Sequence, residues 1–258
     1  MPTMRPSGFL KWRRLKSDDR YTVVMLRPRT ISSLLPMLVL CASLASAQTK
    51  TVSQLVADVK RGDEPALQRL IMMGTAGNAE AQVNLGILYE QGNGVPKDYA
   101  QAVNWYKKAA DQGDSEGQFR LGGMYYEGHG VPKDVVSTAN WYRQAAEQGN
   151  SGAQYGLGVL YSNGDGVPKD HVEAADWHKK SAEQGLAIAQ YALAWMYANG
   201  DGVPTDNVKA FMWWNLAAAQ GFIGAKTNRN TTGKRMTRAQ IAEARKLSRE
   251  WKPKRQNP

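Results

Sequence analysis

Apolar residues recur along most of the chain at the spacing of amphipathic helices. In the stretch that starts at Asn78, apolar side chains at i, i+4, i+7 and i+8 share one helical stripe: Ala81, Leu85, Leu88 and Tyr89. This stripe predicts a first helix over residues 79–91. A second stripe, at i, i+3, i+4 and i+7, predicts a second helix over about 99–112: Ala102, Trp105, Tyr106 and Ala109. The stretch from Asn78 to about residue 112 is therefore expected to form a pair of helices.

The segment between the two predicted helices carries residues that end one helix and begin the next. Gly92 can adopt the left-handed conformation that closes a helix, and Pro96 cannot continue one. Asp98 suits the N-cap of the second helix, because its carboxylate can accept a hydrogen bond from a backbone N–H there. Gly113 ends the second helix.

The whole pattern returns three more times at a spacing of 36 residues. Its anchor residues recur in phase: Leu85, Leu121, Leu157 and Leu193; Trp105, Trp141, Trp177 and Trp213; Gly113, Gly149, Gly185 and Gly221. Small residues recur as well, and they let helices approach closely: Gly86, Gly122, Gly158 and Ala194. One pair of helices cannot bury its tryptophan alone, so stability is expected to come from stacking neighbouring pairs.

The run AEAQVNLGILYEQGNGVPKDYAQAVNWYKKAADQG and its copies resemble the Sel-1-like repeat, a relative of the tetratricopeptide repeat. The resemblance covers residues 78–221 in four copies: 78–113, 114–149, 150–185 and 186–221. Departures from the pattern are few, among them Gly117, Thr138 and His178. The resemblance implies an all-α, right-handed superhelical solenoid of helix-turn-helix repeats (an α/α superhelix) with about eleven helices. It also implies adaptor work, in which a groove holds a protein or peptide, often at the cell envelope.

Both ends of the repeat array are predicted to carry capping helices. In residues 48–77, one helix is expected from Val52 to Arg61, and Asp63 is expected to cap a second one. In residues 222–258, Lys226 to Arg235 is expected to be a loop. Thr237 and Gln240 have the spacing of a capping box, expected to begin a helix that runs to about Trp251 and is followed by a basic, disordered tail: residues 252–258.

The first 47 residues have the form of an export signal. An apolar run over 34–45 follows two arginines and precedes the small-residue site Ala45-Ser46-Ala47. We expect cleavage after Ala47, a periplasmic or secreted product, and no stable membrane span after cleavage. An uncleaved inner-membrane anchor on a regulatory protein is the alternative, and the true start is either Met1 or Met25.

Charge is distributed unevenly along the chain. The net charge is +10, yet residues 48–221 hold 14 basic and 19 acidic side chains, whereas residues 222–258 hold eleven basic and two acidic ones. The basic end is interpreted first as solvated charge, and second as a contact for an anionic surface such as lipid head groups or cell-envelope polymers. Nucleic acid is not the expected partner, because the protein is predicted to be located outside the cytoplasm and the basic tail lacks interleaved aromatic residues.

The sequence offers no convincing catalytic or metal site. The Gly-x-Gly loops follow helices instead of strands, and the four loop aspartates are interpreted as helix caps. The only cysteine, Cys41, lies in the predicted signal, and the three histidines do not form a metal motif. We therefore predict no catalytic residue, no metal and no cofactor.

The first helix of each pair is expected to line the inner surface of the solenoid, by resemblance to tetratricopeptide-like folds. Residues that change from copy to copy on this helix are candidates for ligand binding, and so are the tyrosines expected to flank an opening beside them: Asn84, Arg120 and Trp195, with Tyr155 and Tyr191. Gly152 and Gly156 are expected to leave a shallow opening beside the three aromatic residues, suited to a peptide or a sugar ring. The simpler interpretation is that all of these are ordinary surface or packing residues.

A non-catalytic scaffold that binds protein or peptide partners is therefore the predicted function. The alternative from another class is a protein that binds or hydrolyses cell-wall or β-lactam compounds, as in cysteine-rich relatives of the repeat. Those relatives are stapled by paired cysteines, which this chain lacks. The sequence does not indicate the oligomeric state.

Overall fold

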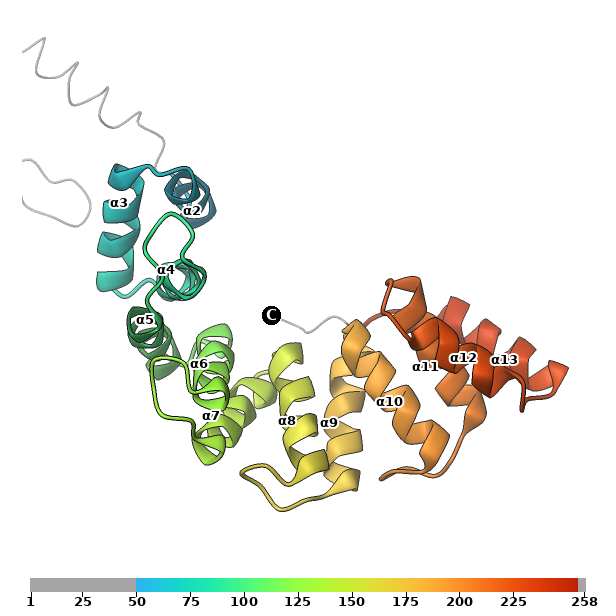
Figure 1. Cartoon of the computed structure of the whole chain (residues 1–258). Coiled ribbons are helices and arrows are strands. Elements are labelled where there is room, and N and C mark those ends of the chain that lie inside the picture. The colour runs from blue at the N-terminus through green and yellow to red at the C-terminus, as the bar shows by residue number, and fades with distance from the viewer. Residues whose placement is uncertain (1–49, 255–258) are drawn as a thin grey trace, which may run out of the picture. The chain divides into compact units, whose positions relative to one another are not determined.

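The computed structural model describes residues 50–254, and the description of the fold is confined to them (Figure 1). This part of the chain forms twelve α-helices and no strand. The four predicted pairs are α4 (Ala79–Gln91) with α5 (Tyr99–Asp111), α6 (Ser115–Glu127) with α7 (Val135–Glu147), α8 (Ser151–Asn163) with α9 (His171–Glu183), and α10 (Ala187–Asn199) with α11 (Asn207–Ala219). The first pair of all is α2 (Val52–Lys60) with α3 (Glu64–Thr75). At the other end, α12 (Ala225–Gly233) and α13 (Arg238–Glu250) both pack on α11. The predicted all-α solenoid is confirmed, with one helix more than expected.

The helix boundaries agree with the prediction because the capping residues act as expected. The Asp98 carboxylate accepts a hydrogen bond from the Gln101 backbone N–H at 3.0 Å, and Gly92 ends α4 in the left-handed conformation. The equivalent caps on α7, α9 and α11 are Asp134, Asp170 and Asp206. The second glycine of each loop packs on the preceding repeat: a Cβ at Gly202 would lie 1.8 Å from the carbonyl oxygen of His171. The second glycine of the Gly-x-Gly pattern therefore allows the loop to pack closely against the preceding helix pair.

The predicted loop at residues 226–235 is wrong, because most of it is the helix α12. Asparagine and threonine are weak helix formers, and the N-cap residue Gly224 makes no side-chain cap. The helix forms because Ala225 and Thr232 are buried, and α12 packs against α11. Tertiary packing thus overrides local preference.

The expected basic tail is also partly ordered. Lys254 donates from its backbone N–H to the carbonyl oxygen of Glu183 at 2.8 Å, and its ammonium pairs with the Glu183 carboxylate at 2.7 Å. Trp251 stacks edge-on against Trp213, with ring centroids 6.0 Å apart. Residues 252–254 therefore lie on the end of α9, while residues 255–258 and the predicted signal over 1–47 lie outside the described residues.

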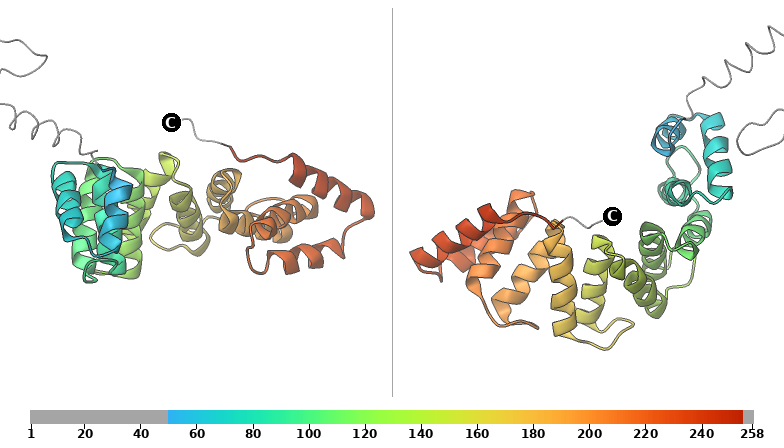
Figure 2. Two further views of the ribbon diagram at one scale, coloured as in Figure 1. Left: turned by 90° about the horizontal axis from the view of Figure 1, so that it is seen from above. Right: turned by 180° about the vertical axis from the view of Figure 1, so that it is seen from behind.

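Consecutive helices from α2 to α12 pack against one another, and α13 packs on α11, so each pair contacts the next (Figures 1 and 2). The tryptophan column lies in these contacts. Trp105 clusters with Leu70 of α3, and Trp213 clusters with Ala182 of α9. Both tryptophans are buried, whereas Trp141 and Trp177 are half-buried. The rings therefore join adjacent copies, as predicted.

The small residues on the first helix of each pair make room for an aromatic ring from the second. A Cβ at Gly122 would lie 2.6 Å from the Tyr142 ring, far inside van der Waals contact. The same contact is made by Gly86 with Tyr106 and by Gly158 with His178. The two helices of a pair could not approach this closely with larger residues at these positions.

A row of buried glutamines joins the repeats in a way that the sequence did not indicate. Gln190 is fully buried and donates to the carbonyl oxygen of Ala182, in the preceding repeat, at 3.3 Å. Gln220 donates to the Gln190 side-chain oxygen at 2.9 Å. The other repeats make the same bond within the repeat, through Gln112 to Gln82, Gln148 to Gln118 and Gln184 to Gln154. The bond to the carbonyl oxygen of the preceding helix pair also recurs, from Gln82 to Gly74, Gln118 to Ala110 and Gln154 to Ala146. Each repeat is therefore tied to its neighbour by polar as well as apolar contacts.

Candidate functional site

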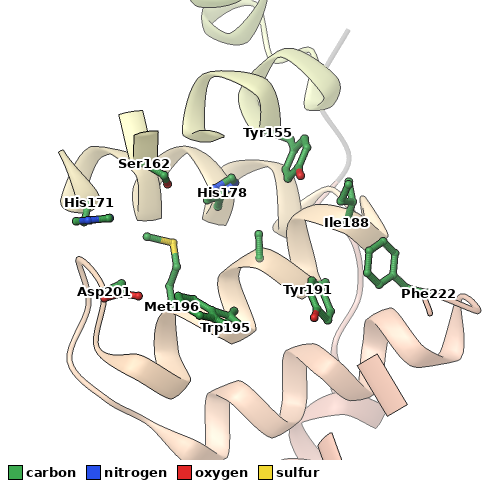
Figure 3. Close-up of a pocket in the computed structure, with 11 residues that line it drawn as sticks. Tyr155, Ser162, His171, His178, Ile188, Tyr191, Trp195, Met196, Asp201 and Phe222 are labelled. Carbon is green, nitrogen blue, oxygen red and sulfur yellow. The ribbon is translucent and has the colours of Figure 1, made fainter. Parts of the chain in front are cut away.

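A cavity of about 440 Å³ opens between α8, α9 and α10, where the third repeat meets the fourth. Figure 3 shows side chains of α8 and α9 on one side and side chains of α10 on the other, with Met196 reaching into the space between them. We call this cavity the α8–α10 pocket. It lies on the first helices of two pairs, which are the helices that were expected to carry a binding surface.

Three of the five predicted site residues line this pocket: Tyr155, Tyr191 and Trp195. Tyr191 and Trp195 are separated by four residues on α10, so they share one face of that helix. Trp195 is 50% exposed, which is unusual for so large an apolar ring. The structure thus brings these three side chains together around one opening.

Aromatic rings close one end of the pocket. Tyr191 packs against Phe222 with ring centroids 4.8 Å apart, and Asn228 donates to the Tyr191 hydroxyl at 2.9 Å. Tyr155 packs against His178 with centroids 5.3 Å apart. These contacts fix the tyrosine rings, so this end of the pocket is formed before any ligand arrives.

The pocket exists because one repeat residue is smaller than its counterparts. In the second repeat, the Tyr142 ring fills the space between α6 and α8: a Cβ at Gly156 would lie 2.6 Å from this ring. The counterpart of Tyr142 is His178, and the counterpart of Gly156 is Ala192, both of which line the pocket. An imidazole is shorter than a phenol, so the space remains open at this junction.

The predicted shallow opening beside Gly152 and Gly156 is therefore wrong. A Cβ at Gly152 would lie 2.9 Å from the Phe119 ring, and the space beside Gly156 is taken by Tyr142. The glycines accommodate rings of the preceding repeat, and the cavity lies one repeat further along the chain.

His178 forms the uncharged back wall of the pocket. Its side chain is 3% exposed, and its Nδ1 atom has no hydrogen-bond partner among the described residues. Burial lowers the pKa of His178 from 6.5 to about 4, because the charged imidazolium would lose its hydration. The imidazole is therefore neutral at neutral pH.

The opposite end of the pocket is polar and carries Ser162, His171 and Asp201. These are the residue types of a hydrolytic triad, but the structure shows no hydrogen bond or ion pair between any two of their side chains. A triad requires such contacts, so this trio does not have its geometry. Across residues 50–254 no group of His, Cys, Asp and Glu has the arrangement of a metal site.

The other two predicted site residues belong to different junctions and do not line the pocket. The Asn84 side chain donates to the carbonyl oxygen of Glu80, one turn earlier on α4, at 2.8 Å. Arg120 pairs with Glu116 on α6 at 2.7 Å. Although burial opposes it, this hydrogen bond and the nearby negative charge raise the pKa of Arg120 above its ordinary value.

Three residues that line the pocket were not among the predicted site residues: His178, Met196 and Phe222. A signal was present at His178, because it replaces the aromatic residue that follows tryptophan in the other copies. Phe222 lies just beyond the last repeat, where no periodic pattern could assign it a neighbour.

The stacked helix pairs define a helical-repeat solenoid, and the α8–α10 pocket is a preformed cavity in it. A sequence profile of the Sel1 repeat matches residues 79–114, 115–150, 151–186 and 187–222. The chain belongs to the Sel1 repeat family. Proteins of this family generally bind other proteins and are generally non-catalytic. No protein with a curated description is significantly similar to the chain.

Two crystal structures illustrate the similarity. A protective antigen present in uropathogenic Escherichia coli strains is 33% identical, has a TM-score of 0.71, and is matched over 80% of this chain. The chain spans only 46% of the length of that antigen. A Sel1 repeat protein from Oxalobacter formigenes is 31% identical, with a TM-score of 0.63, over 74% of this chain and 86% of the other.

Within residues 50–254, every helix is too short or too polar to cross a bilayer.

Proposed function

We propose that the protein is an exported, non-catalytic scaffold that binds a protein partner through the first helices of its repeats. In this proposal the α8–α10 pocket takes up an aromatic or aliphatic side chain of the partner. The observation that carries the proposal is the pocket itself: a preformed cavity of about 440 Å³ between the first helices of the third and fourth repeats.

The lining of the pocket favours an apolar anchor. Met196 and the rings of Tyr155, Tyr191 and Trp195 offer apolar contact, and the neutral imidazole of His178 adds no charge to repel it. The volume is within the range of about 300–1,000 Å³ that small ligands occupy in proteins. Exposed aromatic residues are also the side chains that most often dominate protein interfaces.

The rim of the pocket favours a polar or basic residue next to the anchor. Asp201 lies at the polar end, and its carboxylate forms no ion pair within residues 50–254. Residues 48–221 carry more acidic than basic side chains. A peptide with an apolar anchor followed by a lysine or arginine would therefore match both ends of the pocket.

Export to the periplasm is part of the same proposal and depends on residues 1–47, which lie outside the described residues. The apolar run and the Ala-Ser-Ala site support it. N-terminal sequencing of the protein recovered from cells tests this point: a chain that begins at Gln48 supports export with cleavage, and an intact N-terminus supports the membrane-anchored alternative.

The binding proposal can be tested with a displayed library of random peptides selected on the purified protein. Replacing His178 by Tyr, the residue of the first two repeats, is expected to fill the pocket and abolish binding of the selected peptides. In the first repeat the counterpart of His178 is Tyr106, and the counterpart of Ala192 is Arg120, which also carries a Cβ. A Cβ at position 192 therefore does not exclude a tyrosine at 178. Val136→Ala is the matched control, because Val136 is an exposed apolar residue on α7 that does not line the pocket. Equal loss of binding in both variants, or none in His178→Tyr, contradicts the proposal.

A sugar ring of a cell-envelope polymer is the second candidate for the same pocket. The half-exposed ring of Trp195 favours it, because aromatic faces stack on sugars, and the polar end could bind hydroxyl groups. Adding soluble peptidoglycan fragments to the same binding assay separates the two candidates. The fragments would displace the selected peptides only from a pocket that binds glycans.

A further inference from the structure

Basic residues gather at the C-terminal end of the described chain and lack acidic partners there. Residues 222–254 contain ten Lys and Arg side chains and only two acidic ones, Glu243 and Glu250. Of these ten, Lys254 alone forms an ion pair with a described carboxylate. The positive charge of this segment is therefore largely uncompensated, whereas acidic side chains outnumber basic ones in residues 48–221.

Part of this charge surrounds a cavity. A hollow of about 340 Å³ lies between α11, α12 and α13, and three of its lining residues are cationic: Arg229, Lys234 and Arg245. The lining also includes two amide side chains, Asn215 and Asn230. This group of residues, which we call the C-terminal basic pocket, is separate from the α8–α10 pocket and shares no lining residue with it.

The guanidinium of Arg229 is held in place by neutral groups. It donates to the Asn215 side-chain oxygen at 2.9 Å and to the Asn230 side-chain oxygen at 3.1 Å. The central carbon of the guanidinium, Cζ, lies 6.0 Å from the centre of the Phe211 ring. These contacts fix the guanidinium without neutralising it, so its full positive charge faces the hollow with little freedom left to lose on binding.

We propose that the C-terminal basic pocket binds a phosphate group. Fixed guanidinium groups suit the tetrahedral oxygens of phosphate, and Lys234 and Arg245 supply further positive charge at the rim. The phosphate group could belong to a small soluble anion or to the head group of an anionic phospholipid, and both present the same oxygens. Neither the family nor the peptide-binding proposal requires this site.

The test compares two variants of one helix that lose the same charge. Arg245 lines the pocket, whereas Arg249 lies one turn further along α13 and does not; both are exposed, so neither is needed for folding. Binding of pyrophosphate is measured by calorimetry at low salt, and binding to vesicles of phosphatidylglycerol is measured by flotation, with phosphatidylcholine vesicles as the blank. Arg245→Gln is expected to weaken binding about tenfold, and Arg249→Gln less than about twofold.

Each outcome decides the proposal. Binding of pyrophosphate alone, with the expected difference between the variants, supports a site for small soluble anions. Binding of phosphatidylglycerol with the same difference supports a site for a lipid head group. Equal weakening by Arg245→Gln and Arg249→Gln would show an unspecific charge effect and overturn the proposal, as would failure of the unaltered protein to bind either probe.

Discussion

Two neighbouring glycines of α6 should respond differently to the same substitution. A Cβ at Gly122 would lie 2.6 Å and 2.8 Å from two atoms of the Tyr142 ring and 3.3 Å from the Cβ of Trp141. A Cβ at Gly123 would meet nothing closer than the Tyr142 hydroxyl, at 3.8 Å. Both glycines lie inside the helix, and neither has a positive φ. Alanine is therefore compatible with the backbone at both positions.

The expected magnitudes follow from two terms. Replacing glycine by alanine inside a helix stabilises it by about 1 kcal/mol. At Gly122, however, the Tyr142 ring would have to move by roughly 1 Å, and overpacking of this kind costs about 1–3 kcal/mol. Because the first term is common to both variants, Gly122→Ala should be less stable than Gly123→Ala by about 1–3 kcal/mol. Gly123→Ala should itself be more stable than the unaltered protein.

Urea unfolding followed by circular dichroism measures this difference. A stack of repeats can unfold in more than one step, so both variants should be followed with the same probe and compared with each other. If both substitutions stabilise the protein equally, Tyr142 does not pack against α6 as described, and the account of how the two helices of a pair approach is wrong.

Further predictions concern His178, the glutamine row and the site residues. The pKa of His178 is about 4 in the folded chain and 6.5 in the unfolded one, so the free energy of unfolding should fall by about 3 kcal/mol as the pH falls from 6.5 to 4. His178→Tyr should remove that fall, which urea unfolding at several pH values measures. Gln190→Met should cost about 2–3 kcal/mol in urea unfolding, since Ala182 and Gln220 each lose a partner. Trp195→Ala should weaken peptide binding at least tenfold with little change in melting temperature, because the ring is half-exposed. A large fall in melting temperature would instead assign Trp195 to the core.

The repeat architecture could be predicted because its signals are local and recur in phase. A cap such as Asp98 and a stop such as Gly92 act within a few residues of the chain, so their types and spacing suffice to place the helix ends. The prediction failed at α12, where the residues are poor helix formers and only the contact with α11 explains the helix. Such a contact is absent from the sequence of the segment itself.

The candidate site could be predicted only in part for a similar reason. Tyr155, Tyr191 and Trp195 stand out in the sequence as aromatic residues on the first helices of their repeats, and the structure places them around one pocket. The cavity itself results from a difference in size between His178 and Tyr142, which becomes meaningful only when the packing partner of each ring is known. The sequence therefore indicated the lining but misplaced the opening.

The central claim is that a partner binds in the α8–α10 pocket, and methyl NMR tests it most directly. Ile188 and Met196 line the pocket, whereas Val136 lies exposed on α7 outside it. On titration with a selected peptide, the methyl signals of Ile188 and Met196 are predicted to shift while those of Val136 stay in place, and His178→Tyr is predicted to abolish the shifts. Shifts centred on Val136, or shifts that persist in His178→Tyr, would contradict the claim.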